Sequence, residues 1–117
     1  MKPTLPTLRP LQHKSCLLAR HLTALQLLCH SRSYAERLPD LVVSLCPLAC
    51  QVDELEVMSA GTPLNEPIEQ ANRYLCALLA LLATTPNGLT SVELAPMLVP
   101  AIRLLTEAEQ LAWEVVA

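Results

Sequence analysis

Tyr74-Leu-Cys-Ala-Leu-Leu-Ala-Leu-Leu-Ala83 is apolar around its whole helical circumference. A helix with no polar side has to be covered on all sides, by its own domain or by another protein. Of the 117 residues, 26 are leucine and none is phenylalanine, so the chain has more aliphatic helix surface than a small domain easily hides. Because alanine and cysteine on the segment's remaining sides permit close contact, we expect it to form the central helix.

This segment belongs to a helix expected over residues 66–84. The turn at residues 61–67 precedes the helix, with Thr62 or Asn65 as its cap, and Thr85-Pro-Asn-Gly88 ends it. Its expected core face consists of Ile68, Ala71, Leu75, Leu78, Leu79 and Leu82, with Tyr74 and Leu81 at the edge.

Two helices are expected before it, over residues 12–37 and 40–60. The core stripe of the first helix contains Leu18, Leu22, Leu25 and Cys29, widened by Leu17 and Leu28, and a second seam contains Cys16, Thr23, Leu27 and Tyr34. In the second helix, Asp40 caps the start and Gly61 marks the stop. Pro47 either kinks this helix or begins a new one.

Thr90-Ser-Val-Glu93 is a capping box and predicts a helix start. Pro96 and Pro100 indicate that this helix is short or kinked. A last helix is expected over residues 101–116, with Trp113 on or beside its inward face. That face consists of Ile102, Leu105, Ala112 and Val116.

Together these elements predict an all-α protein, a compact bundle of four to five helices in a single domain over residues 11–117. Prolines at positions 3, 6 and 10 predict an extended N-terminal arm over residues 1–10. Residues 1–37 carry a net charge of +5 and residues 38–117 carry −8. Charged residues make up only 16% of a chain that is 52% hydrophobic, which favours a homodimer or a permanent partner.

The composition predicts a cytoplasmic protein without a membrane span. The longest apolar run is about half of the roughly 20 residues that cross a bilayer. Prolines interrupt the start of the chain before a signal-like hydrophobic region develops. Five cysteines, an odd number without the loops of a secreted scaffold, are expected to be reduced thiols.

No motif predicts an enzyme, a cofactor or a metal. Cys46-Pro-Leu-Ala-Cys50 has a spacing that zinc sites use, but a second clear pair is missing, so we interpret these thiols as small buried hydrophobes. The alternative is a regulatory thiol. His13, His21 and His30 are too far apart to converge and are expected at the surface or an interface. Two glycines exclude a glycine-rich phosphate loop.

Residues 87–95 are similar to the opening of a helix-turn-helix segment in winged-helix regulators. Pro96 and Pro100 fall where that helix and turn should continue. The part of the chain around them is acidic and no basic recognition helix follows, so direct nucleic-acid binding is not expected.

The basic proline-rich start, the leucine-striped first helix and Pro63-Leu-Asn-Glu-Pro-Ile-Glu-Gln-Ala-Asn-Arg-Tyr-Leu75 resemble the QslA-like family of small helical quorum-sensing anti-activators. The resemblance implies a negative regulator that binds a LuxR-type transcriptional activator at its ligand-binding domain. Such binding blocks activator dimerisation and so prevents promoter binding. No functional residue transfers, because no motif fixes a residue-by-residue correspondence.

The residues themselves indicate association through helix faces, with aromatic and leucine side chains as anchors. The candidates for protein binding are Leu27, Tyr34, Tyr74, Leu81 and Trp113. The alternative for each is a core or homodimer position. We place the binding surface on the second seam of the first helix and near Trp113. Competing functions are a cytoplasmic helical chaperone or adaptor for another hydrophobic protein, a DNA-binding regulator and a redox sensor.

Overall fold

The computed structural model describes residues 5–30, 38–84 and 90–116, and these are almost entirely helical. Five helices follow one another: α1 (Leu5–Cys29), α2 (Leu38–Met58), α3 (Asn65–Thr84), α4 (Ser91–Met97) and α5 (Val99–Val116). The described part of the chain contains no strand. The predicted all-α class and the predicted number of helices are therefore confirmed.

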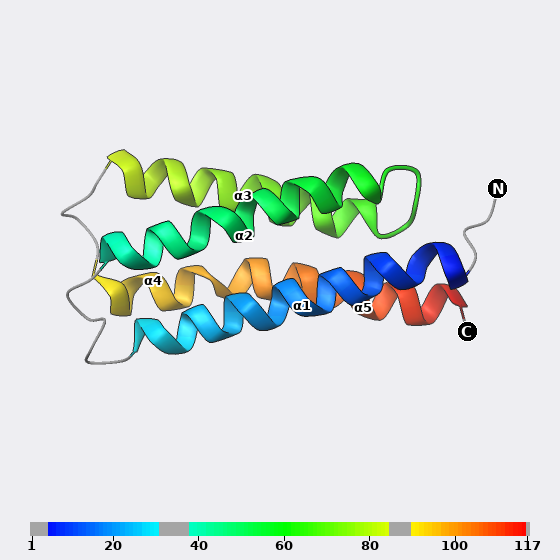
Figure 1. Cartoon of the computed structure of the whole chain (residues 1–117), viewed down its shortest axis with the longest axis horizontal. Coiled ribbons are helices and arrows are strands. Elements are labelled where there is room, and N and C mark those ends of the chain that lie inside the picture. The colour runs from blue at the N-terminus through cyan, green and yellow to red at the C-terminus, as the bar shows by residue number, and fades with distance from the viewer. Residues whose placement is uncertain (1–4, 31–37, 85–89, 117) are drawn as a thin grey trace.

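The helices form an elongated bundle that measures 49 × 24 × 17 Å along its principal axes. The long helices run alternately in opposite directions along the longest axis (Figure 1). α1 packs against α2 and α5, and α3 packs against the same two helices. α4 adjoins the start of α5 and also contacts α1. The architecture is an up-and-down four-helix bundle whose fourth member is interrupted between α4 and α5.

One continuous core runs through the bundle and is built largely from leucine. The expected stripe of α1 is confirmed, because Leu18, Leu22, Leu25 and Cys29 are all buried. The partly exposed side chains of Leu17 and Leu28 lie at its edges. Among the described residues, none of the helices combines the length and hydropathy that a bilayer-spanning segment needs.

α3 occupies a corner of the bundle, so the expectation of a central helix is wrong. Five residues of its expected core face are buried and Leu79 is half-buried against the core: the buried ones are Ile68, Ala71, Leu75, Leu78 and Leu82. The opposite side, which includes Cys76, Ala77, Ala80 and Leu81, is exposed. In a bundle of four helices every member keeps an outer face. The small residues therefore face outward instead of against another helix.

α1 begins at Leu5, inside the segment that the sequence predicted to be extended. Pro6 lies in the first turn, where a helix does not need its N–H. Pro10 lies inside the helix, at a cost of about 3 kcal/mol. Leu8 and Leu11 are buried and offset that cost, at about 1.5–3 kcal/mol each. Residues 5–10 are therefore helical, whereas residues 1–4 lie outside the described residues.

The other boundaries of the first two helices also differ from the expected ones. α1 ends at Cys29, and residues 31–37, the expected last part of this helix, lie outside the described residues. α2 continues through Pro47 without a break. Proline removes the hydrogen bond to the carbonyl of Val43, and both residues are exposed, so water can satisfy that carbonyl.

Gly61 and Asn65 fix the turn between α2 and α3, and Asn72 joins the same two helices further along the bundle. Gly61 has a φ of 81°, in the left-handed region that favours glycine at helix ends. Asn65 donates to the carbonyl oxygen of Glu56 (3.1 Å). Deeper in the bundle, Asn72 is buried and donates to Asp53 Oδ1 (3.0 Å) and Glu56 Oε2 (3.1 Å). These bonds set the rotation of α2 against α3.

The predicted capping box at the start of α4 is confirmed. The Thr90 hydroxyl accepts from the backbone N–H of Glu93 (3.2 Å), and the Glu93 carboxylate accepts from the backbone N–H of Thr90 (3.3 Å). As the prolines indicated, α4 is short, and Leu98 separates it from α5. The side-chain amide of Gln26 on α1 donates to the Ala95 carbonyl (3.0 Å) and holds this junction against α1.

Candidate functional site

A hollow that contains the predicted anchor Trp113 lies between α1 and α5, and we call it the α1–α5 groove. It has a volume of about 540 Å³. Arg9, Pro10, Gln12, His13 and Cys16 of α1 line it, together with Glu109 and Trp113 of α5. The two helices are neighbours along most of the bundle (Figure 1).

Helical periodicity explains why these side chains meet outside the core. On α5, Leu105, Ala108 and Ala112 are buried, which rotates Glu109 and Trp113 onto the outer flank. On α1, the buried leucines leave Arg9, His13 and Cys16 on the flank that faces α5. Side chains four residues apart on a helix are neighbours, so each helix supplies one wall.

Trp113 is the dominant apolar side chain of the groove, and 62% of its surface is exposed. Cationic Arg9 lies on the α1 wall and anionic Glu109 on the α5 wall. An exposed aromatic ring with charges beside it is typical of a protein-binding surface, because the ring supplies buried area and the charges fix orientation. Of the two expected positions for Trp113, on or beside the inward face of its helix, the structure shows the second.

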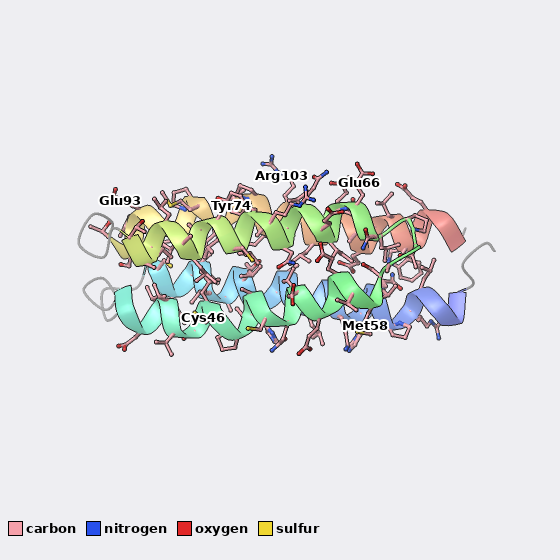
Figure 2. All side chains as sticks on the ribbon, turned by 90° about the horizontal axis from the view of Figure 1, so that it is seen from above. Cys46, Met58, Glu66, Tyr74, Glu93 and Arg103 are labelled. Carbon is pink, nitrogen blue, oxygen red and sulfur yellow. The ribbon has the colours of Figure 1, made fainter. Side chains whose placement is uncertain are left out.

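Tyr74 and Leu81 meet in a second, smaller hollow of about 210 Å³ between α3 and α4. The Tyr74 hydroxyl donates a hydrogen bond to the Met97 carbonyl at the end of α4, and Figure 2 shows this tyrosine on the side of the bundle where α3 lies along α4 and α5. Its ring is half-buried against the core, and burial raises the pKa of the phenol. Tyr74 therefore has a structural task, since it ties α3 to the α4–α5 junction.

Leu27 stands apart from both hollows. Its side chain is 67% exposed and follows Gln26, whose amide binds α4. It is separated from Cys16 by eleven residues, or about 16 Å of helix. Tyr34 lies outside the described residues. The four anchors that the structure describes therefore lie in three places, and among these four only Tyr74 and Leu81 lie together.

A further apolar surface, which the sequence reading missed, runs along the outer face of α2. We call it the α2 outer stripe. It consists of Val43, Cys46, Pro47, Cys50 and Val57, all of them exposed. Val43 is 69% exposed and Val57 is 71% exposed. Val43, Cys50 and Val57 follow one another at intervals of seven residues. This spacing can be read from the sequence, but it normally indicates a core face instead of an exposed one.

The positions of the cysteines correct the expectation of buried structural thiols. Only Cys29 is buried, Cys16 is half-buried, and Cys46, Cys50 and Cys76 are exposed; all five are free. Burial raises the pKa of the Cys29 thiol, and a weaker effect of a backbone hydrogen bond opposes it. His13, His21 and His30 are exposed, as expected. Within the described ranges no three potential ligands of His, Cys, Asp or Glu type gather around a point.

Comparison with known proteins finds no matching family model, no matching curated protein and no matching solved structure.

Proposed function

We propose that this protein is a protein-binding negative regulator that sequesters a LuxR-type quorum-sensing activator in the cytoplasm. In this proposal it occupies the activator's dimerisation surface and thereby prevents DNA binding. The partner class comes from the sequence resemblance to QslA-like anti-activators. The observation that carries the binding role is the exposed ring of Trp113 in the α1–α5 groove.

Among the predicted anchors, Trp113 in the α1–α5 groove is expected to contribute the most binding free energy. Tryptophan is enriched among interface residues whose truncation costs 2 kcal/mol or more, roughly a 30-fold loss of affinity. Tyr74 already donates its hydroxyl to the Met97 carbonyl, so only part of its surface remains for a partner. Leu27 lines neither of the two hollows described above and offers one aliphatic side chain. We therefore infer that Trp113 enters the partner's dimerisation surface and that Arg9 and Glu109 set the orientation.

The shape of the groove is also compatible with competition between this protein and the second activator subunit for the same surface. Dimerisation surfaces of helical proteins bury aromatic and aliphatic side chains between helices. A rigid bundle that presents a tryptophan between two antiparallel helices can take the place of one helix pair of the second activator subunit. The activator would then stay monomeric, and half-sites that need two subunits would not be bound.

The test compares Trp113→Ala with Val92→Ala. Val92 is an exposed apolar residue on α4, outside the groove, and so serves as the matched control. We expect Trp113→Ala to weaken binding to the activator's ligand-binding domain by about 30-fold or more. Val92→Ala should change it by less than about threefold. Calorimetric titration measures affinity, and circular dichroism shows that both variants keep their helices.

A second measurement addresses the regulatory step. Adding the wild-type protein should shift the activator from dimer to monomer in sedimentation and release it from promoter DNA, and Trp113→Ala should do neither at the same concentration. Binding without loss of the activator dimer would contradict the anti-activator mechanism. If a different hydrophobic protein binds stoichiometrically and no LuxR-type activator binds, the proposed function would be wrong. The chaperone or adaptor alternative would then take its place.

We also propose that the protein is a homodimer, on the basis of its uneven charge. Arg9, Lys14 and Arg20 lie on α1, whereas acidic residues predominate on the other helices. Opposite charges on two copies attract, and salt screens such attraction beyond about 8 Å at physiological ionic strength. A dimer dissociation constant that does not change between low and high salt would exclude this electrostatic contribution.

A further inference from the structure

Two exposed thiols lie one helical turn apart on the α2 outer stripe. Cys46 and Cys50 are both free and exposed, and α2 is continuous between them. Figure 2 shows Cys46 on the α2 side of the bundle, away from Tyr74 and Arg103. Free cysteine is among the most buried residue types. Two exposed cysteines at neighbouring positions on one helix therefore call for a chemical explanation.

Helix geometry determines whether Cys46 and Cys50 can form a disulfide with each other or bind one metal ion together. Side chains four residues apart have Cβ atoms about 5–6 Å apart. A disulfide needs a Cβ separation of about 3.5–4.5 Å, so the two cysteines cannot pair with each other while the helix is intact. Zinc–thiolate bonds are about 2.3 Å long and two-coordinate soft ions form shorter ones, so a linear sulfur–metal–sulfur unit spans at most about 4.6 Å between the sulfurs. The helix therefore spaces the thiols for a bridging ion.

The surroundings restrict the kind of ion. In the described part of the chain, no third cysteine, histidine or carboxylate completes a metal-binding group with this pair, so the ligands that this surface supplies are the two sulfurs. Thiolates select soft cations, of which Cu(I) is the biological example. Leu45 and Ala49 are buried beneath the pair and hold this part of α2 on the core. Asp53 and Glu54, one turn further on, add negative charge that attracts a cation.

We propose that Cys46 and Cys50 form a dithiolate site for a soft, two-coordinate cation of the Cu(I) type. Each thiol releases its proton to solvent, and each sulfur donates an electron pair to the metal. Two copper–sulfur bonds form, two sulfur–hydrogen bonds break, and no electron is transferred. The site is independent of the α1–α5 groove, since it lies on another helix and uses no residue of the groove.

The experiment titrates the purified full chain with Cu(I) under anaerobic, reducing conditions against a competing chelator. We expect one copper ion per chain. Cys46→Ser and Cys50→Ser should each weaken the affinity by about 100-fold or more, because the second thiolate on a rigid helix acts at high effective concentration. Cys76→Ser is the matched control, since Cys76 is also exposed but lies on α3, and it should bind copper like the wild type.

Alkylation mapping gives a second readout. Copper should protect Cys46 and Cys50 from iodoacetamide together and leave Cys76 reactive, and circular dichroism should show unchanged helix content. Wild-type affinity in either single variant of the pair would overturn the proposal. It would also be overturned if Cys76→Ser lost as much affinity, or if native mass spectrometry found one copper ion shared by two chains.

Discussion

The α1–α5 groove and the α2 outer stripe both expose apolar side chains, but they differ in shape and chemistry. The groove is concave and places Trp113 between charged residues of two helices. The stripe runs along one helix, contains no aromatic residue and carries two thiols. A hollow with an aromatic ring suits a protein partner, whereas a row of small side chains with paired sulfurs suits a soft ion. Exposed apolar area alone therefore does not define a function.

The largest expected effect separates the core from the stripe. Leu22 is fully buried on α1, and Leu22→Ala should lower the free energy of unfolding by about 2–5 kcal/mol through lost burial and a cavity. Val43→Ala on the stripe should change it by less than about 0.5 kcal/mol. Urea denaturation measures both. A large loss for Val43→Ala would mean that this part of α2 is covered and that the stripe is not a surface.

The second largest expected effect is a difference in alkylation rate between the thiols of the α2 outer stripe and the thiol in the α1–α5 groove. Iodoacetamide should modify the stripe cysteines at least about 100-fold faster than buried Cys29, which reacts only when the bundle opens. Half-buried Cys16 in the groove should react at an intermediate rate. Mass mapping of the modified peptides gives the rates. Adding the activator's ligand-binding domain should protect Cys16 and leave Cys46 and Cys50 reactive, and the reverse pattern would move the protein-binding surface to α2.

Asn72→Asp should test how the rotation of α2 is set. This change removes a buried donor and places a third carboxylate beside Asp53 and Glu56. We expect a loss of about 1–3 kcal/mol in the free energy of unfolding near neutral pH. Folding favours the neutral form of the new carboxyl group and so raises its pKa. The loss should therefore grow as pH rises and shrink in acid, where the protonated group can donate again.

The matched control for that experiment is Asn72→Ala, which removes the same hydrogen bonds without adding charge. Urea denaturation at acidic and neutral pH should show a smaller pH dependence for this variant. Equal losses for the two variants at neutral pH would argue against crowding of three carboxylates. Faster alkylation of Cys29 in Asn72→Asp would show that the α2–α3 bonds also protect the core.

The smallest effect concerns Tyr74. In a Tyr34→Phe background Tyr74 is the only tyrosine, and its phenolate absorbance should appear at a pH above its ordinary pKa of about 10. Burial favours the neutral phenol, so its folded pKa is raised and the unfolded chain ionises first. Its contribution to stability is therefore complete below the ordinary pKa and is lost as pH rises above it. A midpoint at or below the ordinary value would indicate that the phenol is exposed.

Helix identity and local caps could be predicted because short-range rules determine them. The four-residue capping box fixed the start of α4, and the leucine spacing of α1 identified its buried face. The extended segment was wrong over residues 5–10, since buried Leu8 and Leu11 offset the cost of proline. Most of the candidate site was harder to predict. The groove joins residues about a hundred positions apart, and no local pattern places Arg9 beside Trp113.

Local sequence patterns predicted that this protein is helical, where α3 begins and ends, where α4 begins, and most of the residues on the inner faces of α1 and α3. Those properties depend on neighbours within about one helical turn. The packing of the helices against one another places α3 at a corner, ties Tyr74 to Met97, and leaves Cys46 and Cys50 facing outward. A leucine stripe indicates that one side of a helix must be covered by other side chains. Which sides remain open depends on how all the helices pack together.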